Sequence, residues 1–430
     1  MRFVLIFLHP HRRHGIIPAG GDYMKKIIKY YTDSPLILRI VIGLVIGILL
    51  GLFVPAASFV SVFGTVFTGA LKAIAPVLVF VLVIASLAKA GQGLGGRFKT
   101  VIIFYMASTF LAAAAAVFAS YIFPVQIPFV EAAEGSAPAG LGEVFENLLS
   151  NMVMNPVSAL ASANYIGILT WSIILGIALR FLASDKTKEV FTDVSNAVST
   201  VVGWVIQFAP FGIMGLVFSS VGEYGIKIFA DYGKLLLVLV GCMLAVALII
   251  DPLLVAVVLR RNPYPLVFRC FKESGITAFF TRSSAANIPV NMKLCEKLGL
   301  DREYYSVAIP LGATINMDGA AITITVMSLA AAFSQGIEVN ILLAIVLSFV
   351  ATLGACGASG VAGGSLLLIP MACSLLGVGQ DVAMQMVSVG FIVGVVQDSL
   401  ETAINSSGDV LFCATAEFYE RRKKGQPIKF

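Results

Sequence analysis

Oxygen-bearing side chains recur near the C-terminus within a stretch that is otherwise apolar. They are Asp398, Glu401, Thr402, Asn405 and Asp409, and their spacings of three and four residues place them on one face of a helix. A face with three carboxylates and an amide cannot lie against lipid, so a cavity or bound cations must compensate its charge. The alternative, a solvated helix end, applies in part to Asp409 alone.

A second apolar segment carries the run GATINMDGA from Gly312 to Ala320. Asp318 would lie in mid-membrane, where a carboxylate costs about 3 kcal/mol or more. Threonine, asparagine, aspartate and backbone carbonyls supply hard oxygen ligands, which suit a hard cation. Gly319 can unwind the helix and free such carbonyls. The alternative is a hydrogen bond between neighbouring helices.

Two further segments are broken by small and polar residues. The first break reads TRSSAANIP over Thr281–Pro289, where Arg282 needs a partner and the serines can bind a carboxylate at a helix start. Its alternative is a Ser/Asn loop between two ordinary spans. The second break reads GACGASGVAGGS over Gly354–Ser365. It can present carbonyls to a cation and move as a gate, or it can serve close helix packing.

The charges of these segments do not balance. Asp318, Asp398, Glu401 and Asp409 face Arg282 alone. A buried excess of negative charge calls for cations. A zwitterionic amino acid would bring an ammonium group, and bound sodium ions would supply the rest.

The elements that hold these residues are membrane spans. Of 430 residues, 58% are hydrophobic and 12% are charged, whereas a soluble domain carries about 25% charge. Segments of about 20 apolar residues can cross a bilayer. Candidate spans are 36–58, 60–89, 100–123, 156–183, 195–220, 234–259, 303–334 and 382–416, and the broken segments are 264–298 and 339–377.

Basic loops alternate with acidic ones and predict that both termini are cytoplasmic. An even number of crossings follows, so we expect eight transmembrane helices and two re-entrant helical hairpins, the first entered from the cytoplasm and the second from outside. Such an inverted repeat with broken helices is typical of a transporter binding site. The expected fold is therefore an all-α polytopic membrane protein.

Several functions are disfavoured. The six cysteines form no C-x-x-C pair, and the histidines are His9, His11 and His14, so zinc sites and histidine-activated nucleophiles are not expected. An intramembrane hydrolase using Ser283 or Ser284 lacks a base, and no P-loop is present. We expect no enzyme and no nucleic-acid partner.

Three other features concern the N-terminus and two isolated charges. Residues 1–23 are expected to precede the natural start at Met24. Asp251 precedes Pro252 and can cap a kink. Lys72 can extend its amine toward the membrane surface.

Taken together, Thr281–Pro289, Gly312–Gly319, the glycine-rich 357–364 and the Asp398, Asn405, Asp409 face resemble the sodium-coupled dicarboxylate/amino acid symporters, which include glutamate and aspartate transporters. The resemblance covers Met24 to about residue 420. It implies an elevator-type homotrimer in the bacterial cytoplasmic (inner) membrane. It further implies a mainly scaffold region (24–260) whose third and sixth spans join the transport domain, a core transport domain (261–420) and a basic cytoplasmic tail (421–430).

Departures from the family pattern bear on the substrate. Members that take acidic amino acids have arginine at the position of Glu401 and threonine at that of Ala320. Glu401 would repel an acidic side chain and could accept a hydrogen bond from a hydroxyl. Ala362 replaces a proline, which could loosen the second tip. The sequence around 281–289 and Glu401 is most similar to the bacterial serine/threonine:sodium symporters.

The resemblance also implies residue roles. Ser284 and Asn405 would hold the substrate α-carboxylate and Asp398 its ammonium, with carbonyls of Arg282 and Val361 assisting and Ser283, Glu401 and Thr402 beside them. One sodium site would use Gly312, Asn316, Asn405 and Asp409. A second would use Thr314 with carbonyls near Ala355, Cys356 and Ala358. A third would use Tyr105, Ser108, Thr109, Asn316 and Asp318.

The expected function is sodium-driven import of serine and threonine. The alternatives are transport of other small neutral or acidic amino acids or dicarboxylates and, from another class, a channel. A channel differs because uptake through it follows only the substrate's own gradient.

Overall fold

The computed structural model describes residues 34–89, 96–129, 146, 149–356, 358 and 363–428. Every regular element in these ranges is a helix. Within these described ranges, six helices are long and apolar enough to cross a membrane, or seven if one bent pair counts as a single span. The expected all-α, polytopic class is confirmed at this level. The predicted start at Met24, the tract 1–23 and Val361 lie outside the described residues.

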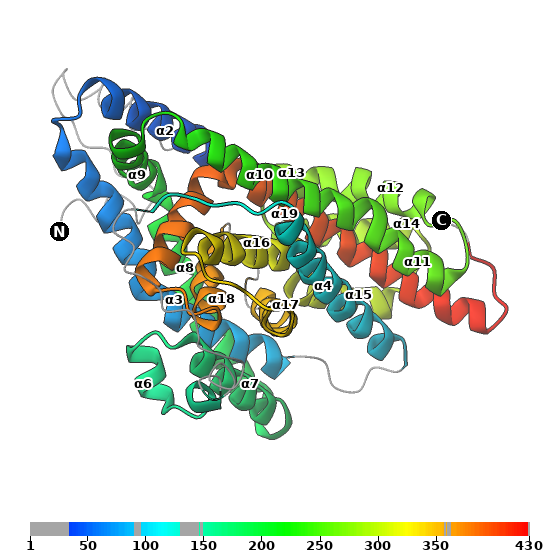
Figure 1. The fold of residues 1–430 in the computed structure, drawn as a ribbon. Helices are drawn as coiled ribbons and strands as arrows, with labels where there is room; N and C mark the ends of the chain where they lie inside the picture. Colours follow the sequence, from blue (N-terminus) through cyan, green and yellow to red (C-terminus); the bar gives the residue numbers. More distant parts are fainter. Residues whose placement is uncertain are drawn as a thin grey trace, which may run out of the picture.

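One group of helices comes mainly from the first half of the chain (Figure 1). Within it α3 packs against α7, α8 and α9, and α2 packs against α9. Its members are α2 (Leu36–Phe53), α3 (Ser61–Lys89), α6 (Pro156–Ala161), α7 (Tyr165–Leu182), α8 (Asp185–Gln207) and α9 (Ala209–Tyr224).

Glycines set the contact between α2 and α9. Gly43, Gly47 and Gly51 recur every fourth residue along α2. A Cβ atom on Gly47 would lie 2.5 Å from the Met214 carbonyl oxygen, and one on Gly43 would lie 2.2 Å from that of Pro210. The two backbones therefore approach as closely as small residues in membrane helices allow.

A second group contains α4 (Gly96–Ile122) and the helices after residue 227. Its members are α10 (Ile228–Ala245), a π-helical turn (Val246–Ile250), α11 (Asp251–Leu259), α12 (Tyr264–Cys270), a second π-helical turn (Phe271–Gly275), α13 (Ile276–Thr281), α14 (Ser284–Lys297), α15 (Arg302–Ile315), α16 (Asp318–Ser334), α17 (Ile341–Ala355), a 3-10 turn η5 (Ser365–Leu368), α18 (Ile369–Leu375) and α19 (Gln380–Lys423).

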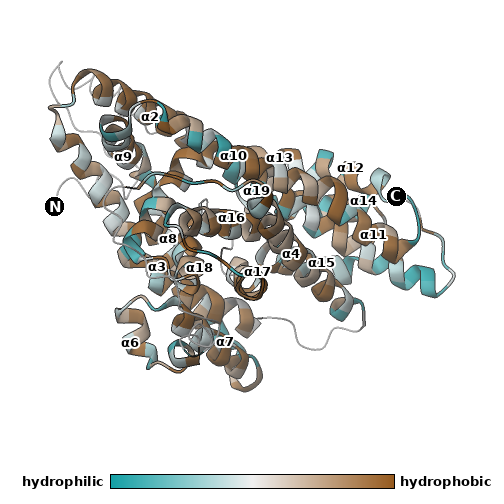
Figure 2. Cartoon of the chain, viewed as in Figure 1, coloured by the Kyte–Doolittle hydropathy of each residue, from teal (hydrophilic) through white to brown (hydrophobic). Residues whose placement is uncertain are grey.

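Two helices form the interior of this second group. α16 packs against both α4 and α19, and every residue from Asp318 to Ala332 is buried. Figure 2 shows apolar segments along most of the helices and hydrophilic residues gathered at the end of α19. Because α16 and α19 are surrounded by protein, they can carry polar side chains that a lipid-facing helix could not.

Two predicted spans differ from the structure. The span 156–183 is divided into α6 and α7, because Asn164 interrupts the first helix and caps the second by accepting a hydrogen bond from the Gly167 amide. The span 195–220 is also divided, and the helices 185–207 and 209–224 meet at 53°. Pro210 at the start of α9 accounts for this bend, since proline cannot continue the α8 hydrogen-bond ladder.

The polar segments coincide with breaks in the helices. Arg282 adopts a left-handed conformation (φ 52°) between α13 and α14. Asn316 and Met317 separate α15 from α16. The helix α17 ends at Ala355, and η5 begins at Ser365. The helix α19 runs without a break across the predicted boundary at residue 420.

The end of α19 is fastened to the rest of its group. Arg422 donates to the Val258 carbonyl at 2.7 Å, and Arg421 donates to the Gly299 carbonyl at 2.5 Å. Ile428 is buried in the same apolar cluster as Leu259. The described part of the predicted basic tail is therefore anchored through Arg421, Arg422 and Ile428, whereas residues 423–427 are exposed.

Candidate functional site

Asp398 on α19 lies where the two broken segments meet. Its Oδ2 atom is 2.5 Å from Nε of Arg282, and its Oδ1 atom accepts a hydrogen bond from the Gly363 amide at 3.0 Å. Arg282 comes from the first break and Gly363 from the second. Asp398 therefore joins both breaks to α19, and Arg282 has the partner that a buried guanidinium requires.

One helical turn further along, Glu401 is surrounded by donors. Its Oε2 atom accepts hydrogen bonds from Thr323 at 2.7 Å, Ser365 at 2.8 Å and Gln397 at 2.5 Å. All four side chains are buried. Charge-assisted hydrogen bonds of this kind stabilise a carboxylate away from water.

Asn316, Asn405 and Asp409 come together at the break between α15 and α16. Asn316 Nδ2 lies 3.1 Å from the Asn405 carbonyl and 3.3 Å from Asp409 Oδ1. The buried atoms Asn316 Oδ1 and Asp409 Oδ2 have no hydrogen-bond donor in the part of the chain that the structure describes. A cation would supply the partner that these two oxygens lack.

Gly312 and Tyr105 border the same cluster. A Cβ atom on Gly312 would lie 2.9 Å from Asp409 Oδ1 and 2.8 Å from the Tyr105 hydroxyl. That hydroxyl donates to the Asp409 carbonyl at 3.0 Å. The structure thus brings together Gly312, Asn316, Asn405 and Asp409, the residues predicted for one sodium site.

Asp318 forms a separate carboxylate centre with α4. Thr109 donates to Asp318 Oδ1 at 2.9 Å, and Ser108 Oγ lies 2.5 Å from Asp318 Oδ2. The Met317 amide donates to Thr109 Oγ1 at 3.2 Å. Ser108, Thr109 and Asp318 therefore meet as predicted, whereas the Tyr105 hydroxyl contacts the Asp409 cluster instead.

Asp251 also belongs to this centre, which was not predicted from the sequence. Its Oδ1 atom lies 3.3 Å from Ser108 Oγ, and the side chain is 3% exposed. A π-helical turn directly precedes Asp251 and Pro252, and the Asp251 side chain contacts Ser108 on α4. The position of this carboxylate in the middle of an apolar span could have indicated a functional role.

The remaining predicted residues lie around these clusters. Thr314 donates to the Leu311 carbonyl at 2.7 Å, and Cys356 Sγ is 3.7 Å from the Ile315 carbonyl, so the second break approaches the end of α15. Ala355 and Ala358 are buried beside it.

Ser283 and Ser284 begin α14. The Ser283 hydroxyl caps this helix by accepting from the Ala286 amide at 3.2 Å, and Ser284 is buried in its first turn. Thr402 donates to the Asp398 carbonyl at 2.8 Å, and Asn405 Oδ1 accepts from the Gly319 amide at 2.8 Å. No described contact joins Ser284 to Asn405.

A polar network that the sequence did not reveal fixes the first break to α19. Asn287 Nδ2 donates to Ser406 Oγ at 2.8 Å, and Asn291 Nδ2 donates to the Ser406 carbonyl at 3.1 Å. Ser274 Oγ donates to Asn291 Oδ1 at 2.5 Å. The spacing of four residues between Asn287 and Asn291 could have indicated this network, because it places both amides on one face of α14.

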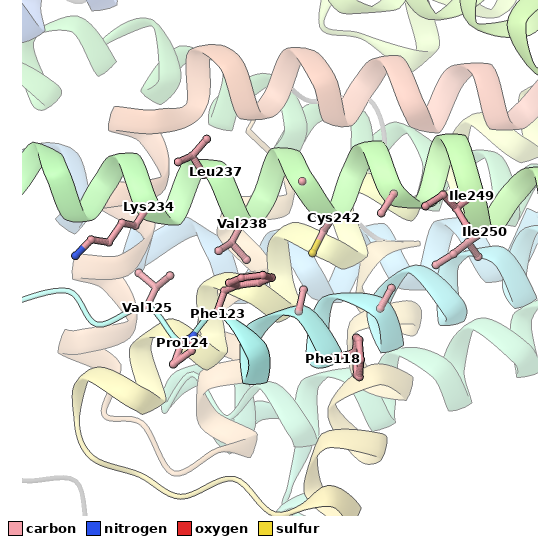
Figure 3. Close-up of a pocket in the computed structure, with 14 residues that line it drawn as sticks. Phe118, Phe123, Pro124, Val125, Lys234, Leu237, Val238, Cys242, Ile249 and Ile250 are labelled. Carbon is pink, nitrogen blue, oxygen red and sulfur yellow. The ribbon is translucent and has the colours of Figure 1, made fainter.

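The cavities of the molecule differ in character. Beside Arg282, Gly363 and Asp398 lies a space of about 10 Å³, which is about the volume that one water probe occupies. The larger cavity, of about 770 Å³, lies between α4 and α10 (Figure 3). Its lining is apolar apart from Lys234 and groups such as the Cys242 thiol, so it does not offer the polar contacts that an amino acid needs.

The geometry combines buried carboxylates, unpaired acceptor oxygens and interrupted helices. A model of the sodium:dicarboxylate symporter family matches residues 36–417. The chain belongs to the sodium:dicarboxylate symporter family. Members of this family are transporters, so both the resemblance and the expectation that the chain is not an enzyme are confirmed.

Relatives in this family are similar over nearly the whole chain. The Bifidobacterium adolescentis protein named serine/threonine transporter SstT is 55% identical over 406 residues, which cover 94% of each chain. Proteins of the same name from two strains of Streptococcus thermophilus are 54% identical over 396 residues, covering 92% of this chain and 98% of theirs. A family transporter with several apolar helices is a multi-pass membrane protein.

Proposed function

We propose that this chain is a sodium-driven symporter that imports serine and threonine. The observation that carries the proposal is the pair Asp398 and Glu401, buried one turn apart at the junction of the two breaks. The Asp398 carboxylate suits the ammonium of an amino acid. The Glu401 carboxylate repels a side-chain carboxylate but can accept a hydrogen bond from a side-chain hydroxyl. The printed names of the 54–55% identical relatives support the same substrates.

Within this proposal the substrate lies between the two breaks. Asp398 binds the ammonium after Arg282 moves aside, and Ser284 and Asn405 bind the α-carboxylate. Ser283, Thr402 and the carbonyls of Arg282 and Val361 complete the site. The contacts of Asp398 with Arg282 and Gly363 support a closure in which both breaks move against α19.

Sodium ions are proposed as co-transported substrates at three positions. The unpaired oxygens of Asn316 and Asp409 support the first, together with Gly312 and Asn405. The hydrogen bonds of Ser108 and Thr109 with Asp318 support another. To this position the proposal adds Tyr105 and Asn316, which contact Asp409 in the structure. The third uses Thr314 and carbonyls of Ala355, Cys356 and Ala358. One sodium ion crossing about 100 mV contributes about 2.3 kcal/mol before its concentration gradient.

We further propose eight transmembrane helices and two re-entrant hairpins, with both termini in the bacterial cytoplasm. The first group of helices corresponds to the trimerisation scaffold and the second to the transport domain, which moves as an elevator. Residues 24–260 then provide the scaffold except for spans three and six, and 261–420 the core transport domain. The packing of α4 and α10 with α16 supports this division.

Uptake by purified protein in liposomes tests the proposal. With sodium outside, labelled serine and threonine should accumulate, alanine less, and aspartate hardly at all. Replacing sodium by choline should abolish accumulation. Preference for aspartate would contradict the reading of Glu401, and uptake that follows only the serine gradient would favour a channel.

The double variant Glu401→Arg with Ala320→Thr tests the side-chain assignment. It replaces the proposed hydroxyl acceptor with a cation, so we expect aspartate to compete with serine more strongly than in the unchanged protein. An unchanged order of preference in a folded double variant would place side-chain selection elsewhere.

A further inference from the structure

We propose that Thr323, Ser365 and Gln397 are positioning residues that hold Glu401 in place to recognise the side-chain hydroxyl of the substrate. The inference rests on the proposed function and adds residues to which no role has been assigned. They come from α16, η5 and α19, so three separate elements set the position of one carboxylate.

The three donors converge on one carboxylate oxygen. Gln397 Nε2, Thr323 Oγ1 and Ser365 Oγ lie 2.5, 2.7 and 2.8 Å from Glu401 Oε2. Among the described residues no donor is assigned to the other oxygen, Oε1. The side chain is thus held through Oε2, and Oε1 remains as an acceptor for a hydroxyl group. Alanine as a substrate has no side-chain hydroxyl to donate to Oε1, and the side-chain carboxylate of aspartate would be repelled by Glu401.

Hydrogen-bond polarity within the cluster is also fixed. Gln397 Nε2 lies 2.7 Å from Thr323 Oγ1 and donates to it. The Thr323 hydroxyl then has one hydrogen to give, and Glu401 Oε2 at 2.7 Å is closer than the Gly319 carbonyl at 3.0 Å. Gln397 therefore supports Glu401 both directly and by orienting the Thr323 hydroxyl.

Ser365 links side-chain recognition to the second break. It lies two residues after Gly363, whose amide contacts Asp398. The same short segment thus touches the proposed ammonium site and the proposed hydroxyl site. The positions of Gly363 and Ser365 therefore couple the hydrogen bonding of Asp398 to that of Glu401.

The test compares three threonine variants of the full-length protein in sodium-driven liposome uptake. Thr323→Val removes the donor with little change of shape, and Thr323→Ser restores it. Thr325→Val is the matched control, because Thr325 is buried in the same helix and its hydroxyl has no partner among the described residues. For each variant, KM and maximal rate are measured for serine and for alanine.

We expect Thr323→Val to lower the preference for serine over alanine about tenfold, through KM for serine, which corresponds to about 1.4 kcal/mol. Thr323→Ser and Thr325→Val should stay within about twofold of the unchanged protein, a difference of about 0.4 kcal/mol. Half-saturation by sodium should stay the same in all three. If Thr323→Val keeps the serine preference of the unchanged protein, whatever its maximal rate, the positioning role is wrong.

Two further variants serve if Thr323→Val does not fold, as judged by gel filtration in detergent. Gln397→Leu and Ser365→Ala each remove another donor, and each should reduce the serine preference. An unchanged preference in both overturns the inference while leaving the proposed function intact. Absence of sodium-dependent serine uptake in the unchanged protein would instead overturn the proposed function, and the inference with it.

Discussion

At the scale of single residues, Asp398 is held by two groups that a substrate ammonium must partly replace. Arg282 is the charged one, with 13% of its side chain exposed against 4% for Asp398. An ion pair this deeply buried stabilises little in itself, but removal of one partner leaves an uncompensated charge. The presence of this ion pair therefore says little about stability, whereas replacing one of its partners should have a large effect.

Asp398→Asn should abolish serine uptake, because an amide cannot balance an ammonium ion. It should also destabilise the protein by about 3–5 kcal/mol, since Arg282 is left buried without its partner. Thermal unfolding in detergent and liposome uptake measure the two effects. Asp381→Asn is the matched control, because Asp381 pairs with Lys72 at 2.8 Å but is 86% exposed. Serine uptake by Asp398→Asn near the normal rate would contradict the ammonium assignment.

Asp251 adds a carboxylate to the centre formed by Asp318 and Ser108. Asp251→Asn keeps the shape and removes one negative charge, so the attraction for a cation at Asp318 should weaken. We expect half-maximal serine uptake to need about tenfold more sodium, equivalent to about 1.4 kcal/mol. A sodium titration of uptake measures this, with Thr325→Val as the control. An unchanged sodium requirement would show that Asp251 contributes only to packing.

At the scale of elements, the contact between α2 and α9 depends on the absence of side chains. Gly47→Ala would place a Cβ atom 2.5 Å from the Met214 carbonyl, whereas Gly233→Ala in α10 meets nothing within 4 Å. We expect Gly47→Ala to lower the melting temperature measured in detergent. Gly233→Ala should leave it unchanged or raise it slightly, since alanine favours a helix by up to about 1 kcal/mol. Equal melting temperatures would argue against close backbone packing.

The sequence predicted which segments carry the site, but it did not predict where some of the helices end. The runs around Arg282, Asn316 and Asp398 were recognisable because charges and amides in apolar segments are costly. The breaks in 156–183 and 195–220 were missed, since they depend on local capping by Asn164 and on Pro210 within segments of suitable overall hydropathy.

The partners of the polar residues could not be predicted in the same way. Gln397 lies one turn before Glu401 and could be expected near it. The contacts of Glu401 with Thr323 and Ser365 join positions 78 and 36 residues away. Such contacts depend on how separate helices pack, which hydrophobic periodicity does not specify.

At the scale of the whole molecule, the described residues of the two groups of helices meet through apolar packing and a small number of specific side-chain pairs. One is the ion pair of Lys72 on α3 with Asp381 on α19 at 2.8 Å, and another is the edge contact of Phe67 with Phe391. If the second group slides past the first, these contacts must break in each cycle. An exposed ion pair suits this role, because it costs about 1 kcal/mol or less to separate.

Cross-linking tests this relative motion. Lys72→Cys and Asp381→Cys, combined in a variant without the six native cysteines, should be joined by a short thiol-cleavable reagent. We expect the cross-link to stop serine uptake and a reducing agent to restore it. The two single-cysteine variants are the controls and should be insensitive to the reagent. Full uptake by the cross-linked protein would contradict a sliding movement between these groups.

The burial of α19 has a consequence for biogenesis. Its face carries Asp398, Glu401 and Asp409, and each carboxylate opposes entry of an isolated helix from the translocon by about 3 kcal/mol. The groups that receive them, such as Arg282, Thr323 and Asn316, are all synthesised earlier. The last helix can therefore pack against its partners as it leaves the translocon, because they are already in the bilayer. The order of the elements along the chain thus favours an order of assembly in which α19 is inserted last.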